Sequence, residues 1–171
     1  MFAKGDFIVY GRTGICEVTD ISTIKMDGVS SDKLYYILCP CHEKGGRIFT
    51  PVDNSKVVMR KVISKDEAAK LVGQIPEIET LWIANEKMRE AQYKESMRTC
   101  DCTEWIKIIK TLYLRRKQRI AQGKKITATD ERYLKQAEGN LYSELSIALG
   151  VPEQDMESYI TEHIESGKKT V

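Results

Sequence analysis

The pattern of hydrophobic and polar residues divides the chain into two parts with different periods. In the first part, β-branched and aromatic residues form short runs separated by turn residues, which is typical of β-strands. Five strands are predicted, at residues 7–10, 15–21, 33–39, 47–52 and 56–62. Five short, closely spaced strands predict a small antiparallel barrel of the SH3-like or Tudor-like kind.

In the second part the hydrophobic period changes to about 3.6 residues, which predicts helices. A first helix is expected after Ser64, whose spacing to Glu67 fits a capping box, and it ends near Gly73. A second helix is expected from Trp82, or shortly after it, to about Met97.

Three further helices are predicted towards the end of the chain. Asp101 and Thr127 are suitable N-caps for the third and fourth helices, Gly150 ends the fourth, and Pro152 begins the fifth. The fourth helix carries a continuous apolar stripe, formed by Leu134, Ala137, Leu141, Leu145 and Ala148. These patterns predict an α+β chain of two domains, a β-barrel over residues 1–63 and a compact all-helical domain over residues 64–171.

The net charge is only +2, but basic residues are concentrated in one stretch. Between residues 105 and 129 there are eight Lys or Arg and no Asp or Glu, whereas the flanking stretches 65–104 and 130–171 hold ten basic and eighteen acidic residues. Three of these lysines, Lys107, Lys110 and Lys117, lie on the polar face of the third helix. The stretch is a candidate phosphate-binding surface, and a solvated helix face beside acidic neighbours is an equal alternative.

The five cysteines include two C-x-C pairs, Cys39 with Cys41 and Cys100 with Cys102. Four thiolates suffice for a structural zinc ion, but this spacing is tighter than that of the usual zinc knuckle. Ordinary buried or turn cysteines are therefore the preferred interpretation, and no metal or other cofactor is expected. The odd number of cysteines argues against a disulfide framework.

Catalytic motifs are not recognisable in the sequence. It has no G-x-S-x-G, P-loop, G-x-G-x-x-G or HExxH pattern, and its only histidines are His42 and His163. We therefore expect a binding protein and not an enzyme. No apolar run is long enough to span a membrane, and the amino terminus lacks the apolar core of a secretory signal, so a cytoplasmic location is expected.

Several segments together resemble the CarD/CdnL family of bacterial transcription regulators. They are F-A-K-G-D-F-I-V-Y at the amino terminus, I-F-T-P-V in the fourth predicted strand, a tryptophan that opens the second predicted helix, and L-Y-L-R-R followed by I-T-A-T-D-E-R-Y-L and L-Y-S-E-L-S-I-A-L. The amino-terminal part is also similar to the RNA-polymerase-interacting domain of transcription-repair coupling factors. The resemblance covers nearly the whole chain, with its parts in the expected order.

The resemblance implies a barrel that docks on the β subunit of RNA polymerase and a helical domain that contacts promoter DNA at the upstream edge of the melted bubble. Trp82 matches the position of a tryptophan that enters the minor groove as a wedge in this family. From the sequence alone, the preferred interpretation of Trp82 is an apolar cover for the joint between the two domains, and the family resemblance reverses that preference in favour of the wedge. Trp105 shares a helical stripe with Ile109 and Leu112 and is expected in the core.

The predicted site residues follow from this comparison. Contacts to the DNA backbone are expected from five basic residues: Lys87, Arg89, Lys107, Lys110 and Lys117. Polymerase binding is expected along the fourth strand, where Pro51 lacks an N–H and suits a sheet edge. The residues of this surface are Arg47, Ile48, Phe49, Thr50 and Pro51.

The function predicted is that of a monomeric regulator, associated with the nucleoid through RNA polymerase, that stabilises the promoter open complex. Alone, it is expected to bind promoter DNA weakly and without sequence preference. One alternative is a stand-alone nucleic-acid-binding protein that does not need polymerase. Another is an adaptor that binds only proteins.

Overall fold

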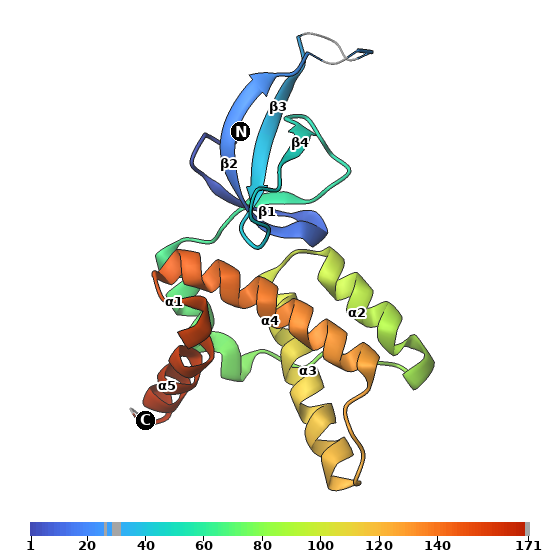
Figure 1. Cartoon of the computed structure of the whole chain (residues 1–171). Helices are drawn as coiled ribbons and strands as arrows, with labels where there is room; N and C mark the ends of the chain where they lie inside the picture. The colour runs from blue at the N-terminus through green and yellow to red at the C-terminus, as the bar shows by residue number, and fades with distance from the viewer. Residues whose placement is uncertain (26, 29–31, 170–171) are drawn as a thin grey trace. The chain divides into compact units, whose positions relative to one another are not determined.

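The computed structural model describes residues 1–25, 27–28 and 32–169, with side chains up to Ile164. The chain divides into two compact units, residues 1–62 and residues 63–171. Figure 1 shows strands in the first unit and helices in the second. The arrangement confirms the predicted α+β class, with an antiparallel sheet followed by a helical region.

The first unit contains one antiparallel sheet of five strands among its described residues, in the order β4-β3-β2-β1-β5. Within these residues β4 and β5 are the two ends of the sheet, so the barrel is not closed by hydrogen bonds between them. The strands are β1 (Phe7–Tyr10), β2 (Gly14–Thr23), β3 (Leu34–Pro40), β4 (Ile48–Pro51) and β5 (Met59–Lys61).

Buried side chains of β1, β2 and β3 form the core of this unit. The buried residues that pack together are Ile8, Cys16, Val18, Tyr36 and Leu38. A short 3-10 turn, Gly11–Thr13, joins β1 to β2. Gly11 has a φ of +45°, and a Cβ atom there would lie 2.7 Å from Cγ1 of Val57, so both the backbone and the space require glycine.

The second unit contains five α-helices and three 3-10 turns in its described residues. The helices are α1 (Lys65–Gln74), α2 (Arg89–Arg98), α3 (Cys102–Ala121), α4 (Ala128–Leu149) and α5 (Met156–Lys169). The 3-10 turns are η2 (Ile75–Glu77), η3 (Glu86–Met88) and η4 (Glu153–Asp155). Among the described residues, no helix combines the length and apolar character that crossing a membrane would need.

The predicted helix ends are largely confirmed. Ser64 and Glu67 form a reciprocal capping box at the start of α1, and the Thr127 hydroxyl accepts from the Asp130 N–H at the start of α4. Gly150 adopts the left-handed conformation that ends α4. Pro152 lies just before η4 and not at the first position of α5, which begins only at Met156.

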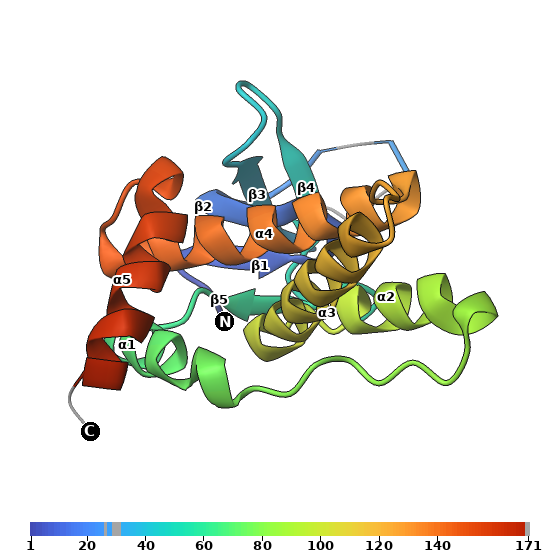
Figure 2. The same cartoon turned by 90° about the horizontal axis from the view of Figure 1, so that it is seen from below.

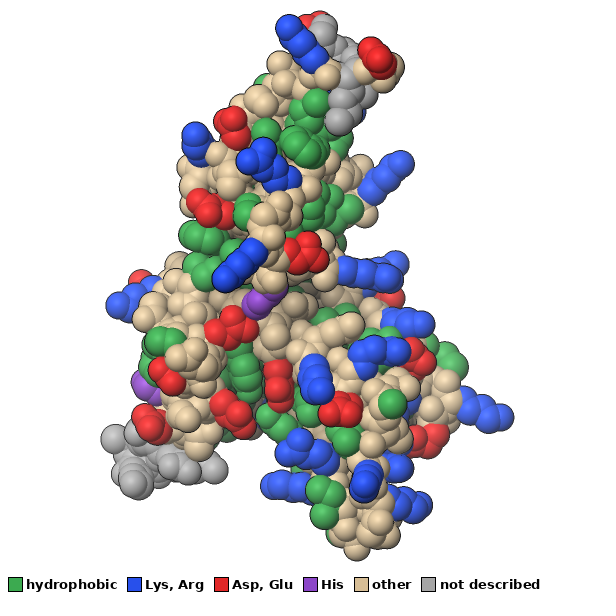
Figure 3. All heavy atoms as spheres, viewed as in Figure 1, with side chains coloured by type: hydrophobic (Ala, Val, Ile, Leu, Met, Phe, Trp, Pro, Cys, Tyr) green, Lys and Arg blue, Asp and Glu red, His purple; other side chains and the backbone are tan. Residues whose placement is uncertain are grey.

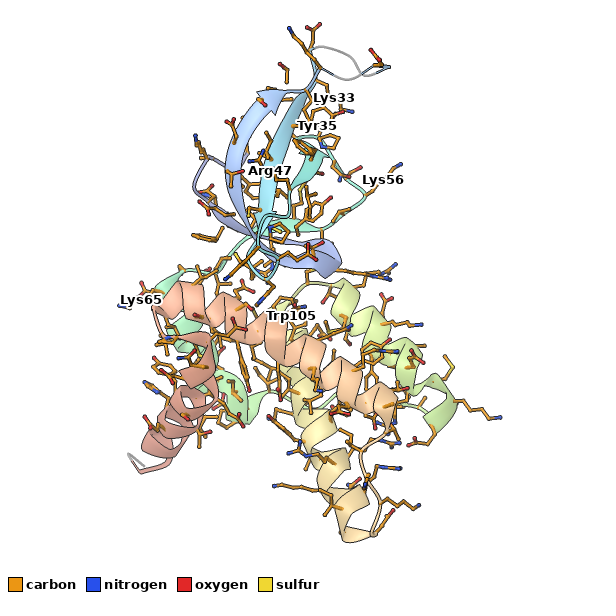
Figure 4. The ribbon with its side chains drawn as sticks, in the orientation of Figure 1. Lys33, Tyr35, Arg47, Lys56, Lys65 and Trp105 are labelled. Atoms are coloured by element: carbon orange, nitrogen blue, oxygen red, sulfur yellow. The ribbon has the colours of Figure 1, made fainter. Side chains whose placement is uncertain are left out.

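The core of the second unit forms where α3 packs against α4. Figure 2 shows these two helices crossing, with α2 beside α3. Trp105, on α3, is fully buried, and its label in Figure 4 lies over α4. Ile109 and Leu112 on α3 are buried with it, as are Leu141 and Leu145 on α4. The prediction that Trp105 is a core residue is confirmed.

Candidate functional site

Trp82 lies on an extended segment, residues 78–85, and not on a helix. Figure 2 shows this segment as a long trace between α1 and α2. The following helical turn begins later than predicted, because Asn85 has extended backbone and its side chain accepts from the Met88 N–H at 3.1 Å. Asn85 is therefore the N-cap, and Trp82 precedes the helix with 77% of its surface exposed.

The chain that precedes Trp82 is hydrogen-bonded to two consecutive residues of α3, Lys110 and Thr111. The Lys110 ammonium donates to the carbonyl oxygen of Ile75 at 2.9 Å and also to the carbonyls of Pro76 and Ile78. The N–H of Leu81, the residue before Trp82, donates to the Thr111 hydroxyl at 2.7 Å. These bonds satisfy backbone groups that an extended segment outside a sheet would otherwise leave to water.

The segment is followed by Glu86, which belongs to a closed ring of hydrogen-bonded polar side chains. Glu86 accepts from Arg89 at 2.9 and 3.1 Å and from Arg115 at 3.2 Å. Arg115 also donates to Asp130 at 2.6 Å, and Asp130 accepts from the Tyr93 hydroxyl at 3.1 Å. A 2.8 Å bond from Arg89 to the Tyr93 oxygen closes the ring. It ties η3 and α2 to α3 and α4.

The electrostatics of this ring follow from its geometry. The hydrogen bonds from Arg89, reinforced by Arg115, lower the pKa of Glu86 to about 2 from 4.5. Burial raises the pKa of Tyr93 to about 12, so its hydroxyl keeps its proton at neutral pH. Asp130 is buried, and its partner Arg115 has only 20% of its side chain exposed. The ring therefore holds two cations and two carboxylates in fixed positions.

Three of the five basic residues predicted to contact DNA have partners inside the protein. Arg89 belongs to the ring. Lys107 forms an ion pair with Glu104 at 3.0 Å. All three donors of the Lys110 ammonium are used by the carbonyls of residues 75–78. A role in DNA binding stays a prediction for these residues, but each would have to exchange an existing partner for phosphate.

The other two, Lys87 and Lys117, are exposed, and among the described residues neither forms an ion pair. Lys117 lies near the end of α3, where Leu114 and Ile120 are 50% and 63% exposed. We call this end of α3 and the following loop the basic tip. Figure 3 shows Lys and Arg side chains gathered over it. Its exposed basic residues are Arg116, Lys117, Lys124 and Lys125.

The first unit presents a second candidate surface at the edge strand β4. Backbone groups in an antiparallel pair point alternately towards the partner and away from it. The Val52 N–H donates to the Leu34 carbonyl at 3.1 Å, which places the backbone groups of Phe49 on the outer side of the sheet. Pro51, which has no N–H, occupies the other outward position of β4.

The predicted polymerase-binding residues differ in exposure. Phe49 is 45% exposed, whereas Thr50 is buried and its hydroxyl accepts from the Asn54 amide at 2.9 Å. Ile48 and Pro51 are half-buried, and Arg47 is exposed just before β4. Figure 4 labels Arg47 on this unit, together with Tyr35, whose cross-strand neighbour is Pro51. Phe49 is therefore the side chain that β4 displays most fully.

The cysteines do not form a recognisable metal site in the described residues, where no group of three or more His, Cys, Asp or Glu is arranged to hold an ion. Burial raises the pKa of the Cys16 thiol to about 12. Cys102 lies buried at the start of α3, and its thiol donates to Glu144 at 3.0 Å. Glu144 also accepts from the Ile63 N–H at 3.1 Å, which fastens the beginning of the second unit to α4.

The residues that hold the chain on both sides of Trp82 were not identified from the sequence. Thr111 and Arg115 lie four residues apart on α3, and their partners Leu81 and Glu86 come from a distant part of the chain. One available signal was the spacing itself, since side chains four residues apart share a helix face. A second was Asp130, a carboxylate at a position where the apolar stripe of α4 begins.

Two family models match the chain. The model described as the CarD-like/TRCF RID domain matches residues 2–63, and that described as the CarD C-terminal domain matches residues 77–161. The two matches follow one another in sequence, and each falls within one of the two compact units but for residue 63. A comparison with curated proteins gave no match.

Proposed function

We propose that this chain, which belongs to the CarD family of transcription regulators that interact with RNA polymerase, stabilises the promoter open complex by inserting Trp82 into the minor groove at the upstream edge of the bubble. Residues 1–63 bind the β subunit of polymerase in this proposal, and residues 64–171 contact the DNA. Domains of this family are regulatory and not catalytic.

The exposure of Trp82 is the observation that carries the proposal. A large apolar ring that is 77% exposed contributes little to the stability of the isolated protein, because it buries little surface there. A gap between unstacked base pairs offers that ring a partner. Since the gap exists only in the melted state, the contact favours the open complex over the closed one.

Docking through β4 provides the second part of the proposal. The outward N–H and C=O of Phe49 suit pairing with a strand of the polymerase β subunit. The exposed Phe49 ring adds apolar contact area beside that pairing. A charge at Phe49 is expected to abolish polymerase binding while leaving the sheet folded, because the ring is outside the core.

Phosphate contacts in this proposal come mainly from Lys87 near Trp82 and from the basic tip. A few such contacts give weak binding that does not depend on sequence and falls steeply with salt. In this proposal the protein acts as a monomer, and its affinity for promoters comes from polymerase. Nanomolar binding to duplex DNA at physiological salt without polymerase would instead favour a stand-alone nucleic-acid-binding protein.

The test is the lifetime of open complexes formed by polymerase with wild-type protein, Trp82→Ala or Trp82→Phe. Stacking of an aromatic ring on a base is worth about 1–3 kcal/mol, so Trp82→Ala is expected to shorten the lifetime by roughly five-fold to a hundred-fold. Trp82→Phe retains a flat ring and is expected to shorten the lifetime of the open complex less than Trp82→Ala does.

Polymerase binding by both variants, measured by pull-down with core enzyme, serves as the control and is expected to be unchanged. If Trp82→Ala binds polymerase normally and the open complexes decay at the wild-type rate, the proposed role of Trp82 is wrong.

A further inference from the structure

The Trp82 segment has no regular secondary structure, yet the chain is attached to the same helix on both sides of Trp82. Its first attachment is at Leu81, which donates to Thr111. Its second is at Glu86, which accepts from Arg115. Residues four apart on a helix have Cβ atoms about 5–6 Å from each other on one face. A single face of α3 therefore holds the chain on both sides of the tryptophan.

The Thr111 hydroxyl is fixed by two hydrogen bonds. It accepts from the Leu81 N–H at 2.7 Å and donates to the Lys107 carbonyl, one turn earlier on α3, also at 2.7 Å. With its donor and an acceptor site both used, the oxygen has a defined position and direction. The backbone next to Trp82 is thus bonded to an atom that the helix itself orients.

The Arg115 guanidinium is fixed in the same manner. Its Nε donates to the buried carboxylate of Asp130 at 2.6 Å, which leaves Nη1 directed at Glu86. Glu86 is the first residue of η3, immediately beyond the N-cap of that turn. The point at which the segment rejoins helical structure is therefore set by α3 and α4, and not by α2 alone.

We propose that Thr111 and Arg115 are positioning residues for Trp82, which hold the segment at Leu81 and Glu86 so that the exposed ring is displayed in one orientation before DNA is met. Lys110 assists by fastening the carbonyls of residues 75–78. The benefit for DNA binding rests on the function proposed above, whereas the positioning itself does not.

The physical advantage is preorganisation. Fixing the backbone of one residue costs roughly 1–2 kcal/mol of conformational entropy. A loose segment would lose that freedom when Trp82 entered the DNA, and the loss would weaken the contact. A segment already held at both ends has lost most of that freedom during folding. Loosening it should therefore shorten the lifetime of the open complex without removing any group that touches DNA.

Thr111 allows the sharper test, because its replacement disrupts no ion pair. Thr111→Val keeps the shape of the side chain but cannot accept from Leu81, whereas Thr111→Ser keeps the hydroxyl. Thr103→Val, near the start of the same helix, is the matched control. All variants are made in the full chain labelled with 5-fluorotryptophan, whose two tryptophans give two fluorine signals that Trp82→Phe assigns.

Two quantities are measured, the mobility of Trp82 from fluorine relaxation and the lifetime of the open complex with polymerase. Thr111→Val is expected to increase the mobility of Trp82, leave the Trp105 signal unchanged and shorten the lifetime about two- to ten-fold, the range for loss of one hydrogen bond. Thr111→Ser is expected to restore both values, and Thr103→Val to change neither.

Unchanged Trp82 mobility in Thr111→Val overturns the positioning role, whatever the function of the ring. Increased mobility with a normal lifetime also overturns it, provided that Trp82→Ala shortens the lifetime. If Trp82→Ala has no effect on the lifetime, the proposed function fails, and the mobility measurement alone then decides whether Thr111 positions the ring.

Discussion

The two tryptophans of this protein occupy opposite settings within the same helical unit. Trp105 lies on α3, the helix that packs against α4, and it is fully buried. Trp82 is 77% exposed on an extended segment. The side chains are identical, so the difference comes from what surrounds each one. Trp105 is placed by helix periodicity, whereas Trp82 is placed by polar residues of a neighbouring helix.

The comparison separates two ways of fixing a side chain. In the core, fixing follows from burial, and each apolar neighbour contributes to stability. At Trp82, the Thr111 hydroxyl accepts from the Leu81 N–H, Lys110 donates to backbone carbonyls and Arg115 donates to Glu86. These hydrogen bonds hold the backbone and leave the indole ring itself uncovered. The second arrangement holds a residue ready for a partner at little benefit to the stability of the free protein.

The largest expected effect is the loss of stability when the buried indole ring of Trp105 is removed. Trp105→Ala leaves a cavity between α3 and α4 and is expected to lower the free energy of unfolding by about 3–5 kcal/mol. Trp105→Phe retains most of the side-chain volume and is expected to lower the free energy of unfolding less than Trp105→Ala does. Urea unfolding followed by circular dichroism measures both. A loss below about 1 kcal/mol for Trp105→Ala would remove the contrast between the two tryptophans.

The next effect concerns the buried residue that supports the exposed segment. Asp130→Asn removes the charge that Arg115 faces at 2.6 Å and is expected to cost about 1.5–3 kcal/mol. Glu131→Gln is the matched control, since Glu131 is the next residue and pairs with Lys135 at the surface, where such pairs contribute little. If urea unfolding showed equal losses of unfolding free energy for the two variants, the ring of polar side chains around Asp130 would add no stability.

Much of the fold was predictable because its signals are local. The capping box of Ser64 and Glu67, the Thr127 cap and the glycine at 150 depend on residues within one turn of each other. The strands and the burial of Trp105 follow from short periods in the hydrophobic pattern. The fold class rests on these features and is confirmed.

The candidate site was less predictable because its contacts join distant parts of the chain. The DNA contact of Lys110 stays a prediction, and the sequence did not indicate that its ammonium binds carbonyls of residues 75–78, which lie more than thirty positions earlier. The sequence gives no periodic signal for such a pairing. The later start of the second helix is a different case, because Asn85 is a local N-cap that the sequence does contain.

A smaller effect is expected from the acid titration of Glu86. Its folded pKa of about 2 lies below the ordinary 4.5, so its ion pairs stabilise the protein fully above pH 4.5 and progressively less as the pH falls towards 2. Because 67% of the side chain is exposed, solvent screens the pairs and the effect is about 0.5–1 kcal/mol.

The measurement is the difference in unfolding free energy between wild type and Glu86→Gln at several pH values. The difference is expected to be constant near neutral pH and to vanish near pH 2. Glu95→Gln is the control, because Glu95 forms only an exposed pair with Arg98. A difference that does not change with pH would contradict the assignment of the low pKa to Glu86.

The smallest expected effect is that of Trp82→Ala on stability. The ring buries little surface and its removal opens no core cavity, so the free energy of unfolding should change by no more than about 0.5 kcal/mol. The hydrogen bond from the neighbouring Leu81 N–H to Thr111 does not involve the ring and should persist. Thermal and urea unfolding of Trp82→Ala, run beside Trp105→Ala, measure the contrast directly. If Trp82→Ala destabilised the helical unit as strongly as Trp105→Ala, the ring would be a structural element, and its exposure would no longer argue for a partner.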